Sequence, residues 1–389
     1  MPAMPLTLDH LRRYAVARTM FKPTTLMRAI HKLGFVQADP IRAPARAQDL
    51  TLRHRVIGYR AGDLERRYPR LPLEEDFFVN YGFLPRAHQA LMHPRSARQA
   101  WTPTRWKQAR AVRDFVAEHG VVHPRQVDAH FCHGKTTNWF GGSSNASTRQ
   151  LDGMHYRGLL RVAGRASGTR TYAVRDDAAP VDAAAIDARL DALIDIIVRK
   201  YAPLPDASLG QLVAYLGRGV PQWDTARKAA LRRARQHLQR CRVDGIDWLW
   251  PVDERAESRR WKPDAQVRLL TPFDPLVWDR RRFQLLWGWA YRFEPYTPAP
   301  KRKLGYYALP LLWRDRVIGW GNLSVSEGTL HSQLHYVVGM PPPDPLFDDA
   351  LEAELARMRD FLGLGSQEGT TPSGHPRGET CPPMEGHRR

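Results

Sequence analysis

The stretch RVAGRASGTRTYAV, residues 161–174, decides the fold more than any other part of this sequence. Alternating apolar positions predict two short strands, and the Gly-rich middle predicts the turn between them. The arginines in this stretch give the expected hairpin a basic surface. Apolar residues at helical spacing predict three helices before it, at about 107–119, 123–131 and 147–160. Three helices followed by a basic hairpin predict a winged helix, which is a common DNA-binding unit.

The same order is expected near the N-terminus. Leu8, Leu11 and Tyr14 recur at helical spacing, and the segment 26–33 does so again. Gly34 then suits the end of the second helix, and residues 35–41 suit a short strand. Two helices followed by a strand are the skeleton of another winged helix.

A third copy is expected after a linker at 176–183. Its predicted elements are helices at 184–200, 209–216 and 224–240, and a strand at 246–250. After about residue 265 the apolar period changes from helical toward strand, which favours a small antiparallel barrel. A last helix is expected at 346–362, and the Gly-, Pro-, Ser- and Thr-rich residues after it are typical of a disordered tail.

The predicted fold class is therefore α+β: three tandem winged-helix domains followed by a C-terminal antiparallel β-barrel. The expected boundaries are 1–100, 101–180 and 181–265 for the winged helices, 266–362 for the barrel and 363–389 for the tail.

Charge indicates the class of partner. The 389 residues contain 59 Lys and Arg against 40 Asp and Glu, a net charge of +19. Such an excess favours a polyanion, most often nucleic acid. The sequence has no apolar run of about 18 residues and no secretory signal, so no membrane association is expected. We expect a cytoplasmic protein that is associated with the nucleoid when it is bound to DNA.

Gln37-Ala38-Asp39 is the motif that points to chemistry. In a strand, positions i and i+2 face the same side, so a carboxamide and a carboxylate would stand together. Pro40 biases Asp39 toward the extended conformation that this geometry needs. Three other Gln-x-Asp patterns occur, but they fall on predicted helices or at a helix entry. The structural alternative for Asp39 is an ordinary carboxylate at a strand end.

Two blocks of sequence carry a resemblance to a known family. They are LGFVQADPIRAPARAQDL (33–50) and the segment 269–312, which runs from LLTPFDPLVWDRRRF to YTPAPKRKLGYYALPLL. Together they resemble the AlkZ/YcaQ-type bacterial DNA glycosylases over about residues 6–362. Gln37 and Asp39 match the Gln-x-Asp, YcaQ-like branch of that family.

The resemblance implies three tandem winged helices and a barrel that grip DNA. It also implies excision of N-alkylated purines and unhooking of interstrand crosslinks. We therefore expect a monofunctional, monomeric glycosylase that acts on double-stranded DNA carrying alkylated or crosslinked bases. Asp39 would be the catalytic carboxylate, and Gln37 would position the water. A carboxylate can stabilise the developing oxocarbenium-like sugar or act as a general base.

No lysine accompanies the motif, so Schiff-base lyase chemistry is not expected. No cofactor or metal is expected either. A zinc interpretation would need a group whose spacing matches no closed zinc site: His119, His123, His130, Cys132 and His133.

The candidate DNA contacts are basic residues on the second predicted recognition helix, on its hairpin and on a loop of the barrel. They are Arg149, Arg157, Arg161, Arg165, Arg170, Lys301, Arg302 and Lys303. The sequence departs from the family pattern at Phe77, where Trp is usual, at Val79, where His is usual, and at Asn322, where Asp is expected. These departures leave open which lesion is the substrate.

The alternative from another class is a winged-helix transcriptional regulator without catalysis. Such a protein would read a particular DNA sequence, normally as a dimer. A glycosylase would instead depend on a lesion and on Asp39.

Overall fold

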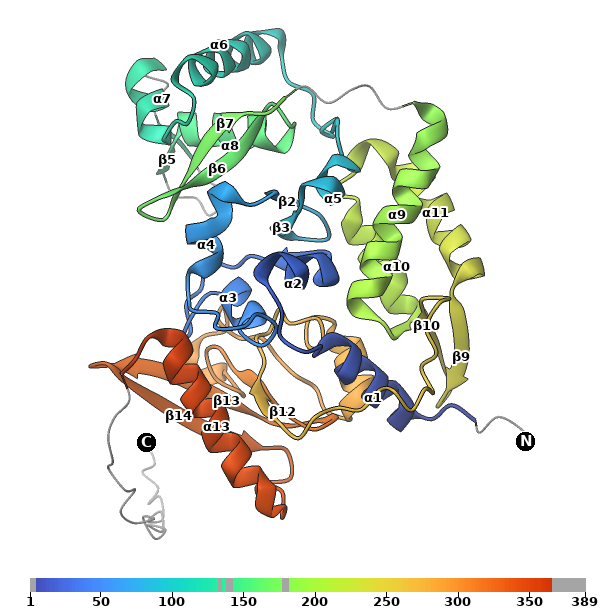
Figure 1. The fold of residues 1–389 in the computed structure, drawn as a ribbon. Coiled ribbons are helices and arrows are strands. Elements are labelled where there is room, and N and C mark those ends of the chain that lie inside the picture. Colours follow the sequence, from blue (N-terminus) through green and yellow to red (C-terminus); the bar gives the residue numbers. More distant parts are fainter. Residues whose placement is uncertain (1–4, 132–134, 138–142, 177–181, 366–389) are drawn as a thin grey trace, which may run out of the picture.

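A computed structural model describes residues 5–131, 135–137, 143–176 and 182–365 (Figure 1). Nearly all of the expected tail lies outside these ranges, and so do Cys132 and His133. Within them, no helix combines the length and the apolar character needed to cross a membrane.

The first 100 residues surround a three-stranded antiparallel sheet with the order β1-β3-β2. The elements are α1 (Leu8–Thr19), α2 (Leu26–Leu33), β1 (Val36–Gln37), α3 (Ala47–Leu52), α4 (Asp63–Arg67), η1 (Tyr68–Arg70), β2 (Leu73–Phe77), β3 (Tyr81–Pro85) and α5 (Arg86–Ala90). The predicted helices are confirmed here, whereas the strand expected at 35–41 is only two residues long. Gly34 ends α2 in the left-handed region, with φ 68°, a conformation that favours glycine.

The second part contains the helices and the hairpin that the opening stretch of sequence predicted. Its elements are α6 (Pro103–His119), α7 (Pro124–Phe131), β4 (Lys135–Thr137), β5 (Ser143–Asn145), α8 (Ala146–Tyr156), β6 (Leu160–Ala166) and β7 (Thr169–Val174). Strands β6 and β7 pair antiparallel, and the turn between them has positive φ at Ser167 and Gly168.

The third part also has three helices followed by two paired strands. Its elements are α9 (Ala183–Tyr201), β8 (Leu204–Pro205), α10 (Asp206–Leu216), η2 (Pro221–Trp223), α11 (Asp224–His237), β9 (Gln239–Val243) and β10 (Ile246–Trp250). A three-stranded sheet with the order β8-β10-β9 ends it. The number of winged helices stays a prediction.

The C-terminal sheet corrects the expectation of a barrel. Its elements are β11 (Val267–Leu269), α12 (Arg280–Trp287), η3 (Ala299–Lys301), β12 (Leu309–Trp313), β13 (Arg316–Ser326), β14 (Thr329–Tyr336) and α13 (Pro345–Leu362). The strands form an open antiparallel sheet in the order β11-β12-β13-β14. The sheet curls, but β11 and β14 do not pair within the described residues, so it forms half a barrel and not a closed one.

Two helices join the ends of the chain. Leu11, Tyr14 and Val16 of α1 pack with Trp248 and Phe283 in one core, so α1 lies against later segments of the chain. Helix α13 crosses beside the C-terminal sheet (Figure 1), and its apolar residues share a core with α2 and β3. The first and last parts therefore stabilise each other.

Candidate active site

The catalytic motif lies where β1 ends. Gln37 pairs with Gly82 of β3, and a Cβ at Gly82 would come within 2.3 Å of the Val36 carbonyl oxygen. Glycine at this position therefore allows the two strands to approach. Past the strand, the Ala38 N–H still donates to the Tyr81 carbonyl (3.0 Å). The expectation that Asp39 lies within a strand at 35–41 is therefore wrong: β1 ends at Gln37, and Asp39 follows it.

The Asp39 carboxylate is held by its own chain. Its Oδ1 accepts from the Ile41 N–H (2.9 Å), and its backbone N–H donates to Gln48 Oε1 (3.3 Å). Within the described residues Asp39 has no ion pair. Burial raises the pKa of Asp39, and the Ile41 hydrogen bond opposes this shift. The carboxylate is consequently more basic than an exposed aspartate.

Asp39 lines a cavity of about 350 Å³ between the end of β1 and the β6–β7 hairpin. Two oxygen atoms in its walls are buried without a hydrogen-bond partner in the described structure: Glu75 Oε2 and the Tyr81 hydroxyl. Burial raises the pKa of Tyr81 well above its usual value, so the hydroxyl stays protonated and can donate. Arg46 Nε, in the same walls, is also buried without a partner in the described structure, so the cavity walls hold one unpaired acceptor and two unpaired donors.

The Gln37 side chain is held by a residue from the C-terminal part of the chain. Its side chain is buried, and Trp278 Nε1–H donates to Gln37 Oε1 (2.7 Å). Since the indole nitrogen can only donate, the carboxamide oxygen is occupied and the NH₂ group remains for other partners. Gln37 does not line the cavity that holds Asp39. The expected side-by-side arrangement of the two side chains is therefore only partly present.

Lys200 is a buried residue near the motif that the sequence did not single out. Its Nζ donates to the Phe35 carbonyl, just before β1. Burial, together with the positive charge of Arg55, lowers the pKa of Lys200 to about 7, and the carboxylate of Asp274 opposes this shift. Lys200 does not line the Asp39 cavity. It anchors the strand that carries the motif.

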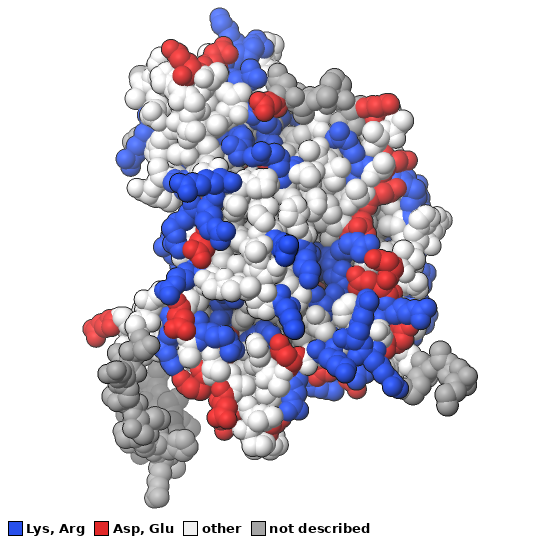
Figure 2. Space-filling view, in the orientation of Figure 1, with Lys and Arg blue, Asp and Glu red and all other residues white. Residues whose placement is uncertain are grey.

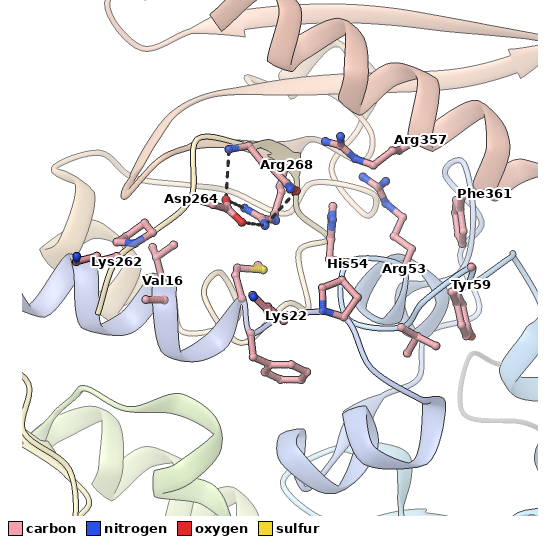
Figure 3. A pocket seen from close by; sticks show the side chains of 18 of the residues that line it. Val16, Lys22, Arg53, His54, Tyr59, Lys262, Asp264, Arg268, Arg357 and Phe361 are labelled. Atoms are coloured by element: carbon pink, nitrogen blue, oxygen red, sulfur yellow. Dashed lines mark hydrogen bonds and ion pairs between the residues drawn. The ribbon is translucent and has the colours of Figure 1, made fainter. Parts of the chain in front are cut away.

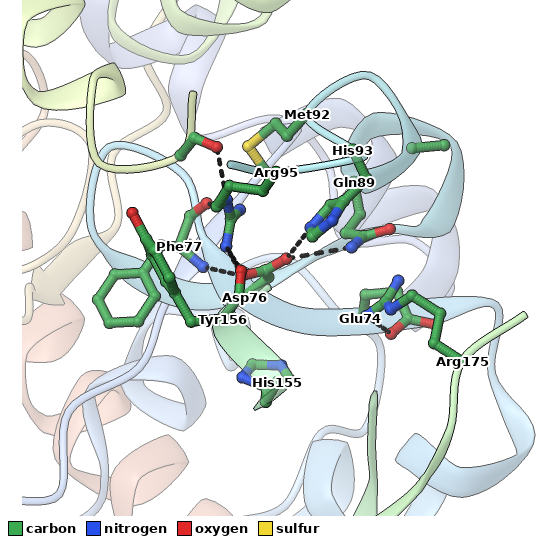
Figure 4. Close-up of polar contacts among 12 residues, drawn as sticks. Glu74, Asp76, Phe77, Gln89, Met92, His93, Arg95, His155, Tyr156 and Arg175 are labelled. Carbon is green, nitrogen blue, oxygen red and sulfur yellow. Dashed lines mark hydrogen bonds and ion pairs between the residues drawn. The ribbon is translucent and has the colours of Figure 1, made fainter. Parts of the chain in front are cut away.

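Strand β2 supplies three consecutive buried carboxylates, Glu74, Glu75 and Asp76, and Figure 4 shows Glu74 and Asp76 with their partners. Arg95 Nη1 and His93 Nε2 contact the two Asp76 oxygens, both at 2.9 Å. Burial opposes ionisation of Asp76, but the positive charge of Arg95 and the His93 hydrogen bond outweigh it and hold its pKa well below the usual value. This cluster was not predicted, because a run of acids does not look like a buried strand.

Comparison with known proteins now adds to this geometry. The family model described as "DNA glycosylase AlkZ-like" matches residues 30–361. The chain belongs to the AlkZ-like DNA glycosylase family. The structure also matches Streptomyces sahachiroi DNA glycosylase AlkZ with a TM-score of 0.60 and 14% identity, covering 93% of this chain and 98% of that one. This likeness shows a shared fold.

The AlkZ-like chain is thus a DNA glycosylase, and DNA is its substrate. The family assignment favours the enzyme over the transcriptional regulator. No group of three or more His, Cys, Asp or Glu that could hold a metal ion occurs among the described residues.

In this AlkZ-like chain, the hairpin arginines expected to contact DNA have protein partners. Arg165 and Arg170 pair with Glu75, and Arg161 pairs with Glu74. Outside the hairpin, the Arg157 guanidinium lies over the Trp101 ring, 3.8 Å from its centre. Arg149 is not without a partner either. Arg161, Arg165 and Arg170 brace the hairpin against β2, and any role toward DNA would be additional.

The barrel loop differs from the hairpin. Lys301 and Lys303 are exposed and have no ion pair in the described structure, whereas Arg302 Nε donates to the Thr297 carbonyl (2.8 Å). Figure 2 shows Lys and Arg gathered around α1 and below the β6–β7 hairpin, with acidic groups between them. Tyr307 lies on the same loop. Burial is the main cause that raises its pKa, and the negative charge of nearby Asp39 also contributes.

The three departures from the family pattern have structural roles. Val79 is buried in an apolar core, where an imidazole would need a polar partner. Phe77 packs edge-to-face on Tyr81 and Tyr156. Asn322 Nδ2 donates to the Leu304 carbonyl (2.9 Å), a hydrogen bond that an ionised aspartate could not make.

Proposed function

We propose that this chain is a monofunctional glycosylase for N7-alkylated guanine in DNA, with Asp39 as the catalytic carboxylate. The observation that carries the proposal is the half-buried Asp39, which has no cationic partner among the described residues and lines a cavity. A carboxylate in this position is free to respond to positive charge or to a water proton. A structural carboxylate such as Asp76 is instead surrounded by donors.

An N7-alkylated guanine is a good leaving group, so the enzyme does not need to protonate it. An N7-alkylated guanine carries a positive charge, so it leaves as a neutral base when the bond from C1′ to N9 breaks and its electrons pass to the purine. The sugar becomes oxocarbenium-like, and water adds to C1′. Asp39 accepts a proton from this water or stabilises the positive sugar, and the raised pKa suits it to the first role.

Gln37 acts as a hydrogen-bond donor in this scheme. Its oxygen is occupied by Trp278, so only its NH₂ group is left to donate. Because Gln37 does not line the Asp39 cavity, its NH₂ group would reach the attacking water or a DNA backbone oxygen from beside that cavity. The sequence alone allowed it to accept as well as donate. Trp278 thereby becomes a positioning residue for the motif.

Unhooking of an interstrand crosslink is part of the proposal. A crosslinked base cannot rotate freely into a closed pocket, so the enzyme must reach the sugar from a groove. The Asp39 cavity is bordered by the β6–β7 hairpin, which would allow a carboxylate to approach bound duplex. Among the described residues that line this cavity there is no lysine, which supports hydrolysis without a Schiff base.

The test compares duplexes that contain N7-methylguanine, an N7-linked interstrand crosslink or no lesion. After incubation with the enzyme, alkali cleaves abasic sites, and a denaturing gel separates the products. We expect cleavage of the first duplex and unhooking of the second. Borohydride should trap no covalent complex, whereas a trapped complex would show Schiff-base chemistry. No reaction with either lesion would contradict the proposed substrate class.

A further inference from the structure

A second cavity lies away from the catalytic motif. It has a volume of about 950 Å³, and its walls come from the end of α1 and the next turn, residues 53–60, residues 260–268 and α13 (Figure 3). It shares no lining residue with the Asp39 cavity. Helix α3 lies between them, because Gln48 near its start lines one cavity and Arg53 just after its end lines the other.

The inner wall of this cavity contains buried guanidinium groups. The Arg53 side chain is 3% exposed, and it pairs with Glu354, which Arg357 also contacts at 3.0 Å. Arg53 Nε is buried without a partner in the described structure. Arg268 forms two hydrogen bonds with Asp264, both of 2.6 Å. Arg53 therefore still has an N–H group that can donate. Figure 3 shows that Arg268 and Arg357 lie in the same wall.

The mouth of the cavity carries basic side chains that form no ion pair within the described residues. Four exposed basic side chains line it and have no ion pair within the described residues: Lys22, Arg60, Arg260 and Lys262. The acidic residues of the lining are Asp264 and Asp360, and Asp264 is already paired. This cavity therefore has a strong excess of positive charge and favours an anion.

Aromatic rings stand beside these charges. The lining includes Phe21, Tyr59, Trp261 and Phe361. Arg260 lies over the Trp261 ring at 4.3 Å, and Arg53 lies at 5.7 Å from the centre of the Phe361 ring. Aromatic and guanidinium planes are the surfaces on which nucleobases stack.

We propose that this cavity is a second nucleic-acid site that binds a nucleoside phosphate, either as a free nucleotide or as one nucleotide of a single strand. The phosphate would accept from Arg53 and its basic neighbours, and the base would stack on the aromatic wall. The volume lies within the range of about 300–1,000 Å³ that is usual for small-ligand sites. An inorganic phosphate would leave the rings and most of this volume unused. The site is independent of catalysis by Asp39.

The test measures binding of deoxyadenosine monophosphate and of a short labelled oligothymidylate to the full chain. The variant is Lys22→Glu with Lys262→Glu, two exposed positions that carry no ion pair and should not disturb folding. The matched control is Lys107→Glu with Arg110→Glu on α6, which changes the charge equally at exposed, unpaired positions. Titration calorimetry follows the nucleotide, and fluorescence anisotropy at several salt concentrations follows the oligonucleotide.

We expect the cavity variant to weaken binding of at least one probe by about tenfold or more, with a shallower salt dependence for the oligonucleotide. The α6 control should stay within about threefold of wild type, and Asp39→Asn should bind like wild type. Loss with the nucleotide identifies a free-nucleotide site, and loss with the oligonucleotide alone identifies a single-strand site. Absence of binding, equal loss in the control, or equally tight competition by inorganic phosphate would overturn the proposal.

Discussion

At the scale of the residue, the environment of Asp39 determines what it can do. Burial raises its pKa, and the Ile41 N–H that opposes this shift belongs to its own turn. No arginine neutralises the carboxylate within the described structure, although arginines line the same cavity. A desolvated carboxylate without a partner lowers the stability of the fold, which is common at catalytic positions.

The pH dependence of excision should report this residue. A general base acts only when it is ionised, so the rate should fall as the pH decreases through the pKa of folded Asp39. That pKa lies above the ordinary aspartate value of 3.8, so we expect the acid limb of kcat/KM to lie above pH 3.8 as well. Single-turnover excision across acidic pH measures it. A rate that stays constant down to pH 3.8, with the protein still folded, would contradict this role.

Trp278→Phe tests the positioning of Gln37. The change removes the indole N–H and leaves Gln37 Oε1 buried without its donor, an arrangement that costs about 1–3 kcal/mol. We expect kcat to fall by about tenfold with little change in KM, because the duplex is bound elsewhere. The measurement is steady-state excision of the lesion-containing duplex.

The control for this variant is Trp287→Phe, which loses a comparable hydrogen bond to the Asp315 carbonyl (3.1 Å) away from the motif. It should leave kcat near the wild-type value. If both variants lowered kcat equally, the effect would be general destabilisation, and Trp278 would have no positioning role.

At the scale of the element, β2 is the unusual part of this fold. Its acids face basic residues that come from several elements: Arg86, Arg161 and Arg175 pair with Glu74, and Arg165 and Arg170 with Glu75. The strand therefore holds the β6–β7 hairpin beside the Asp39 cavity through ion pairs. Removing one partner of a buried pair leaves an uncompensated charge, which is costly.

Asp76→Ala should reveal the importance of this strand. The substitution leaves Arg95 buried without its carboxylate, so we expect the free energy of unfolding to fall by about 3–5 kcal/mol. Urea denaturation measures it. Asp195→Ala is the control, because Asp195 pairs with Arg199 on the exposed surface, where a pair contributes about 0–1 kcal/mol. Equal losses in the two variants would show that Asp76 is not a structural centre.

Helical elements were easier to predict than this strand. The helices near 8–19, 107–119, 184–200 and 346–362 have apolar residues at regular spacing, so local pattern alone located them. Strand β2 reads LEEDF, and its acids are buried only because distant arginines neutralise them. Helix α12 was also missed, because its RRRF start looks like a charged loop. Burial that depends on long-range pairing has no local signature.

The site shows the same limit. The sequence located Gln37 and Asp39, but the Trp278 donor lies 241 residues away. The hairpin arginines were predicted as DNA contacts, whereas the structure pairs them with glutamates from β2. A basic side chain in a DNA-binding protein has the same sequence signal whether its partner is a phosphate or a buried carboxylate.

At the scale of the whole molecule, distant segments are joined by buried arginines. Arg55 binds Asp274 through two nitrogens, at 2.8 and 3.2 Å, and thereby connects the N-terminal part to the segment that contains Trp278. Arg95 donates to the carbonyls of Tyr156 (2.9 Å) and Gly219 (2.7 Å), which connects the first three parts. Ion pairing does not change the formal net charge of +19, which favours binding of a polyanion such as DNA.

Lys301→Ala with Lys303→Ala tests where this charge meets duplex DNA. Both side chains are exposed and unpaired in the described structure, near the loop that brings Tyr307 toward Asp39. We expect duplex affinity to fall and the slope of log K against log salt to become shallower by about 1–2. Anisotropy with an undamaged duplex measures both values. An unchanged slope would show that this loop does not contact phosphates.

The most direct test of the central claim is release of free N7-methylguanine from duplex DNA under single-turnover conditions, measured by mass spectrometry for wild type and Asp39→Asn. The raised pKa means that ionised Asp39 destabilises the fold, so the variant should melt at or above the wild-type temperature. It should also bind the duplex at least as tightly, since it has one negative charge less. We predict release by wild type and at least about a hundredfold slower release by the variant. Equal rates from two folded, DNA-bound proteins would contradict the catalytic role of Asp39.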